Sequence, residues 1–210
     1  DSAVEVDSPQ TQLHLEIPGV ANLPDPSQRS VLLMVLDGVR AEESCGEEVS
    51  SVTGMTGAEL MPFLWGTLAE HSAVNRHLLN TGITFTGPSH AQMISGRFAP
   101  FLNLAQDETS LPPVPYAYPG LFQALTQAGR TSAVVANTLL LGAIANSNYP
   151  GSHADTSFHI VSSRTDLPVL PVLENVLSTE HPSFTLVNFH LSDREGHLDN
   201  PQAFTVAVQT

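Results

Sequence analysis

Four short apolar runs, each followed by a polar or turn-forming residue, constrain the fold of this chain more than any other feature. They lie at 31–36, 131–136, 158–161 and 184–189. The run at 31–36 is continuously apolar, which is typical of a strand in a parallel sheet that is covered on both faces, and the other three are also expected to be strands. Segments with helical spacing lie before, between and after these runs, at 61–71, 88–96, 120–129, 169–177 and from 201 onward. The sequence therefore predicts an α/β domain with three layers, in which helices flank a mostly parallel central sheet.

The remaining segments are expected to be less regular. Residues 1–29 are polar and interrupted by prolines, so we expect an N-terminal segment with one short strand at 11–17, followed by a single domain over 30–210. The acidic, Gly- and Ser-rich segment 41–58 predicts a mobile loop. Its four glutamates are expected to be solvated: Glu42, Glu43, Glu47 and Glu48. A further strand is expected at 73–79, and the proline-dense stretch 111–119 is expected to lack regular structure.

Composition excludes several classes of partner. The formal charge is −14, from 21 acidic residues against 7 basic ones, all of them Arg. Such a surface repels nucleic acid and anionic lipid, although bound cations can still attract an anionic substrate. No apolar run is long enough to span a bilayer. The single cysteine, Cys45, permits no disulfide within the chain.

The stretch 84–96 places a threonine at the start of a predicted helix. Pro88 suits the first position of a helix, and Gly96 suits its end. Thr86 is therefore expected just before the helix N-terminus, where free backbone N–H groups and the helix dipole favour an anion, or a hydroxyl that becomes one. On this stretch alone, a Thr86 that merely caps the helix is the simpler interpretation.

Polar residues follow two of the predicted strands at their carboxyl ends, where open α/β sheets build their sites. Asp37 follows the first run directly, although an Asp-Gly pair is also a common turn. Asp193 lies just past the run 184–189, and His197 comes four residues later, a spacing that lets a carboxylate and an imidazole bind one cation. These ligands suit zinc, manganese or iron. We interpret His190, at the end of the same run, as a structural residue.

Three motifs occur in order: an apolar strand with Asp-Gly, Thr-x-Pro-Ser-x-x-x-x-x-Ser-Gly, and a strand with Asp-x-x-Gly-His. Together they resemble the alkaline phosphatase superfamily of metal-dependent phosphatases, phosphodiesterases, sulfatases and cofactor-independent phosphoglycerate mutases. The resemblance runs from about residue 30 to residue 201. Thr86 resembles the nucleophile of the nucleotide pyrophosphatase/phosphodiesterase branch. Sulfatases place a cysteine there and follow the Pro-Ser pair with Arg, where this chain has His90.

The resemblance implies a role for each position. Asp37 would be a metal ligand, and Thr86 would be both the nucleophile and a metal ligand. Asp193 and His197 would hold the second of two divalent ions, with zinc expected first and manganese as the alternative. Asn103 would hold a phosphate oxygen, although its spacing is not a clean match. In this scheme the ions stabilise the threonine alkoxide and neutralise the phosphoryl oxygens.

The chain departs from the family pattern after His197. Relatives carry a later Asp-His-Gly stretch and a further late His that complete both metal sites, and nothing here after His197 can serve. The expectation is therefore the N-terminal part of an alkaline phosphatase-like catalytic domain without its C-terminal part. It would be a fragment or one piece of a processed chain, and the missing part or a second chain would complete the sites.

The expected function is that of a metal-dependent phosphodiesterase or phosphomonoesterase acting on a small phosphate ester. The alternative is a catalytically inactive relative that serves as an extracellular structural or binding protein. We expect a secreted or periplasmic location, because a removed signal peptide would explain the opening at Asp1. An artificial start of the chain would explain it equally well.

Overall fold

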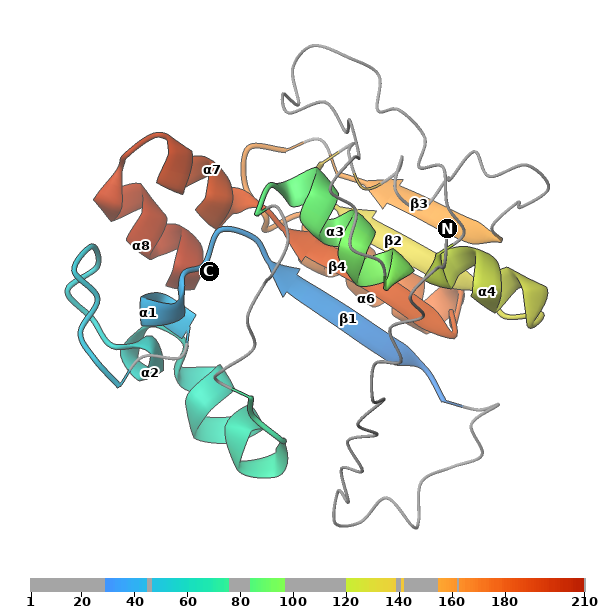
Figure 1. The fold of residues 1–210 in the computed structure, drawn as a ribbon, viewed down its shortest axis with the longest axis horizontal. Helices are drawn as coiled ribbons and strands as arrows, with labels where there is room; N and C mark the ends of the chain where they lie inside the picture. The colour runs from blue at the N-terminus through green and yellow to red at the C-terminus, as the bar shows by residue number, and fades with distance from the viewer. Residues whose placement is uncertain are drawn as a thin grey trace, which may run out of the picture.

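The computed structural model describes residues 29–44, 47–75, 84–96, 120–138, 141, 155–161 and 163–209, and Figure 1 shows their arrangement. The strands predicted from the four apolar runs are confirmed. They are β1 (Val31–Leu36), β2 (Ser132–Ala136), β3 (Thr156–Ile160) and β4 (Phe184–Phe189). They form one parallel sheet in the order β1-β4-β2-β3. The strand expected at 11–17, most of the one at 73–79 and the stretch 111–119 lie outside the described residues, and residues 73–75 form no strand.

Helices pack on both faces of the sheet, because side chains alternate between the faces of each strand. On one face, Val134 and Leu186 pack in one cluster with residues of α3 (Thr86–Ser95) and α4 (Leu121–Gln127). On the other face, Val135 and Val187 pack with α6 (Val169–Thr179). The architecture is thus α/β with a parallel sheet, and it is compatible with the expected three layers.

The outermost strand of the described sheet, β1, is less buried than its sequence predicts. It pairs with β4 alone among the described strands. Four of its six side chains are exposed: Val31, Leu32, Met34 and Leu36. The prediction of a strand shielded on both faces is therefore wrong for β1, whereas every side chain of β2 is buried. Apolar content predicts strand formation, but it does not fix a strand's position within the sheet.

Four helices gather beyond the carboxyl ends of the strands (Figure 1). They are α1 (Ala41–Ser44), α2 (Gly57–Leu60), α7 (Leu191–His197) and α8 (Pro201–Gln209). The first two correct the prediction of an unstructured loop over 41–58. Glu43, which we expected to be solvated, is fully buried, and its carboxylate accepts hydrogen bonds from Arg40 and Ser50.

The helical spacing over 61–71 produces two short, non-α helical segments. A π-helix covers Leu64–Leu68, and a 3₁₀ turn covers Ala69–His71. The apolar side chains Phe63, Leu64 and Leu68 are exposed, and they line a cavity of about 480 Å³. Within the part of the chain that the structure describes, none of the helices has the length and apolar character needed to cross a membrane.

Candidate metal centre

Parallel pairing of β1 with β4 brings Asp37 and His190 together. Leu36 lies opposite Phe189 in the register, and the Asp37 N–H extends the ladder by donating to the Phe189 carbonyl at 2.9 Å. Asp37 and His190 each follow directly on the last residue of their strands. As a result, His190 Nδ1 lies 3.4 Å from Asp37 Oδ2.

The first turn of α7 adds Asp193 to this pair. Its Oδ2 lies 3.7 Å from His190 Nδ1. The turn is fixed to the end of β1, because the Ser192 hydroxyl donates to the Asp37 carbonyl at 2.5 Å. Gly38 permits this approach: a Cβ atom there would lie 2.7 Å from the Asp193 nitrogen and closer still to its Cα. Gly38 also has φ +74°, a conformation that L side chains rarely adopt.

Asp37, His190 and Asp193 form a donor set that suits a divalent cation. Each offers one ligand atom, and these atoms all lie within 4.8 Å of one another. An ion that binds nitrogen and oxygen donors at about 2.0–2.2 Å requires donors no more than about 4.4 Å apart, so only a small closure is needed. Two carboxylates with one imidazole are ligands that zinc and manganese accept. The three side chains together can therefore hold one metal ion.

The electrostatics of the site favour an ionised Asp37. Burial raises the pKa of this carboxyl. The hydrogen bonds from His190 and Asn188 act in the opposite direction, and the pKa lies below its ordinary value. Asp37 is therefore a carboxylate at neutral pH, which is the form that binds a cation.

The sequence favours a structural role for His190, whereas the structure places it where it can serve as a metal ligand. Its imidazole belongs to the only cluster of three potential metal ligands found among the described residues. A signal for it was present in the sequence, since His190 and Asp37 each come immediately after a predicted parallel strand. What the sequence alone does not reveal is that these two strands are adjacent and aligned at their ends.

None of the other predicted site residues belongs to this three-residue cluster. His197 Nε2 is 3.6 Å from Asp193 Oδ1, but its side chain is 76 % exposed and it is not part of the three-residue group. Thr86 is the first residue of α3 rather than the residue before the helix, a position occupied by Phe85. The Thr86 carbonyl lies 2.7 Å from Nδ1 of His90. Asn103 lies outside the described residues.

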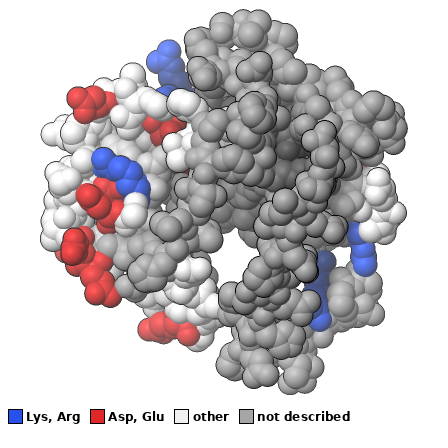
Figure 2. Space-filling view, viewed as in Figure 1, with Lys and Arg blue, Asp and Glu red and all other residues white. Residues whose placement is uncertain are grey.

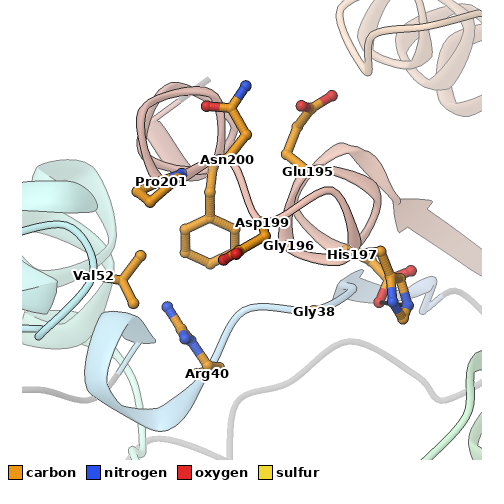
Figure 3. A pocket seen from close by; sticks show the side chains of 11 residues that line it. Gly38, Arg40, Val52, Glu195, Gly196, His197, Asp199, Asn200 and Pro201 are labelled. Carbon is orange, nitrogen blue, oxygen red and sulfur yellow. Dashed lines mark ion pairs between the residues drawn. The ribbon is translucent and has the colours of Figure 1, made fainter.

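A pocket of about 310 Å³ opens beside the cluster (Figure 3). Asp193 and His197 line it from α7, Arg40 lines it from the segment after β1, and Phe204 lines it from α8. Arg40 lies over the Phe204 ring, 5.0 Å from its centroid, and also pairs with Glu43. On the face drawn in Figure 2, acidic side chains gather over the side where Figure 1 places α1, α2, α7 and α8. These acidic side chains favour the approach of cations on this side of the molecule.

Neither a scan of the chain against models of known protein families nor a search of curated protein sequences found a match.

Proposed function

We propose that this chain belongs to a metal-dependent phosphoric ester hydrolase, a phosphodiesterase or phosphomonoesterase of the alkaline phosphatase superfamily. One observation carries the proposal: the donor atoms of Asp37, His190 and Asp193 converge at the carboxyl edge of a parallel sheet. The same edge carries ligand sites in open α/β folds generally. The motif resemblance, which includes an alkaline phosphatase-like fold, supplies the reaction class.

We assign each residue a separate role. Asp37, His190 and Asp193 would hold one divalent ion, zinc or manganese, and His197 is the proposed ligand of a second. Bound ions supply positive charge that stabilises an alkoxide and the phosphoryl oxygens. Thr86 is the proposed nucleophile. Its oxygen forms a bond to phosphorus as the ester P–O bond breaks, its proton passes to solvent, and the leaving alcohol takes up a proton.

The position of Thr86 supports this role. It is the first residue of α3, so the backbone N–H groups of the first helical turn lie beside it. These groups and the helix dipole stabilise negative charge on a bound phosphate. No lysine is required, because bound cations neutralise the substrate. A secreted or periplasmic location, as expected from the sequence, is also part of the proposal.

The first test is metal binding. Protein purified without chelator should contain zinc or manganese in a stoichiometric amount, and Asp37→Asn and Asp193→Asn should each reduce that content strongly. Elemental analysis after gel filtration measures it. If the wild type and both variants carry the same trace of metal, the proposal is wrong.

The second test is turnover of an aryl phosphate ester by metal-loaded protein that also includes the part expected to complete the metal sites. Thr86→Ala should abolish turnover, whereas Thr86→Ser should retain part of it, because the attacking oxygen survives. A threonine that only caps the helix would instead cost about 1 kcal/mol of stability and leave the rate unchanged. Stoichiometric metal without turnover by the wild type would favour the non-catalytic binding protein.

A further inference from the structure

Asn188 places a polar carboxamide in the buried interior of β4. The residue is fully buried, as are the four strand residues before it. Its Nδ2 lies 3.3 Å from Asp37 Oδ2 and 3.0 Å from His90 Nε2, so each amide hydrogen has one acceptor. Its Oδ1 is also buried, and no hydrogen-bond partner for it is found among the described residues.

This arrangement is a poor solution for stability alone. A buried amide oxygen without a partner loses its hydrogen bonds to water and forms none to the protein, whereas an apolar residue would avoid that cost. Residues that break a local rule in this way are expected at functional sites. What Asn188 contributes is therefore to be sought in the two groups that its nitrogen contacts.

The first of these groups, His90, carries the connection to α3. Its ring is buried, and Nδ1 lies 2.7 Å from the Thr86 carbonyl oxygen. Because a carbonyl oxygen only accepts, Nδ1 carries the proton and donates it. Nε2 is then the acceptor for the Asn188 amide. Burial lowers the pKa of His90, more than the Thr86 bond and the Asp37 charge raise it, which agrees with a neutral ring.

We propose that Asn188 and His90 are positioning residues that couple the first turn of α3 to the metal centre. The chain of hydrogen bonds runs from the Thr86 carbonyl through His90 and Asn188 to Asp37 Oδ2, and so joins α3 to the end of β1 across β4. Asn188 fixes the orientation of the Asp37 carboxylate. His90 fixes the position of Asn188 relative to the helix that bears Thr86. The inference rests on the proposed function, because it assumes that Asp37 binds an ion.

The expected change in metal affinity follows from the effect of similar positioning residues in other metalloproteins. Groups that orient a metal ligand without touching the ion typically change metal affinity by about 10–100-fold when they are removed. Asn188→Leu removes the bond to Asp37 while keeping the side chain close in size. Thr185→Val is the matched control, because Thr185 lies on the same strand, is buried, and has an Oγ1 for which the described residues offer no partner.

The experiment is a titration of the chain with Co²⁺, followed by the visible absorption of the bound ion and by the melting temperature. Asn188→Leu should weaken Co²⁺ binding about tenfold or more and change the absorption band, because the geometry of the Asp37 ligand changes. Thr185→Val should leave both unchanged. His90→Phe, a second variant of similar ring size, should weaken binding less than Asn188→Leu, since its effect reaches Asp37 only through Asn188. If Asn188→Leu fails to fold, the Co²⁺ affinity of His90→Phe decides whether the two residues position Asp37.

Two kinds of failure can be told apart. If the wild type binds Co²⁺ no better than Asp37→Asn, the proposed function fails, and the positioning role fails with it. If the wild type binds Co²⁺ and both Asn188→Leu and His90→Phe match Thr185→Val in affinity and absorption band, only the positioning role is overturned. A lowered melting temperature with unchanged Co²⁺ binding likewise assigns the two residues to stability alone.

Discussion

At Gly38 the end of β1 approaches α7 so closely that no side chain fits between them. Gly38→Ala should therefore displace Asp193 and weaken metal binding. The left-handed backbone alone costs about 1–2 kcal/mol for an L residue, and forcing atoms into a filled space adds about 1–3 kcal/mol. Urea unfolding and a metal titration measure the two effects.

Gly54 provides the control for this prediction. Its φ is +69°, close to the +74° of Gly38, but a Cβ there would meet nothing within 4 Å. Gly54→Ala should show the backbone cost alone, with metal binding unchanged. Equal effects of the two substitutions would contradict the close approach of Asp193 as the cause.

The buried carboxylate of Glu43 predicts a pH dependence of stability. Burial raises the pKa of Glu43, but hydrogen bonds from Ser50 and Arg40 outweigh it, and the pKa lies below its ordinary value of 4.5. The carboxylate therefore stabilises the fold fully above pH 4.5, and this contribution is lost as the pH falls through the lower pKa of the folded state. Glu43→Gln should cost about 1–3 kcal/mol at pH 7.

The difference between wild type and Glu43→Gln should shrink as the pH is lowered below 4.5, because the wild-type carboxyl then becomes neutral too. Urea unfolding at a series of pH values from 7 to 3 measures this. A difference that stays constant across the series would show that the charge of Glu43 contributes nothing to the fold.

At the scale of elements, α7 depends on a residue far away in the sequence. The Leu191 N–H at its start donates to Asp166 Oδ2 at 2.7 Å, and Asn137 Nδ2 donates to the other oxygen of that carboxylate at 3.1 Å. Asp166 thus acts as a cap for the helix that carries Asp193. Asp166→Ala should cost about 1–2 kcal/mol, speed amide exchange in α7 and weaken metal binding.

Two variants separate the cap from the charge of Asp166. Asp166→Asn keeps an acceptor oxygen and should retain part of the stability. Glu174→Ala removes an exposed carboxylate from α6 and should leave α7 and the metal affinity unchanged. If Glu174→Ala speeds exchange in α7 as much as Asp166→Ala does, loss of negative charge rather than loss of the cap is responsible.

Elements were more predictable from the sequence than the positions they take. The runs at 31–36 and 184–189 became strands because apolar, β-branched content favours them, and Asp37 was marked by the strand before it. Strand order is set by contacts between distant segments, so neither the exposed edge of β1 nor the pairing of Asp37 with His190 follows from local pattern. The buried Glu43 was missed for the same reason, because its partners are recognised only once the segment folds back.

At the scale of the whole molecule, the proposed metal centre connects the end of β1 to the end of β4 and the start of α7. Asp37 directly follows β1, whereas His190 directly follows β4 and Asp193 lies in the helix after it. Within the described sheet, β1 is tied to the other strands through β4 alone. The acidic groups of the cluster repel one another unless a cation lies between them.

Because the ligands lie at the ends of both β1 and β4, the free energy that holds β1 on the sheet should depend on the concentration of the metal ion. An ion that binds only when β1 is paired with β4 stabilises the paired state by about 2.7 kcal/mol at a concentration 100 times its dissociation constant. Amides of β1 should then exchange with solvent more slowly when metal is added, while those of β3 at the opposite edge should change little. Equal slowing in β1 and β3 would mean that the ion stabilises the entire fold. Slower exchange in β1 alone would mean that the concentration of metal controls how often β1 detaches from the sheet.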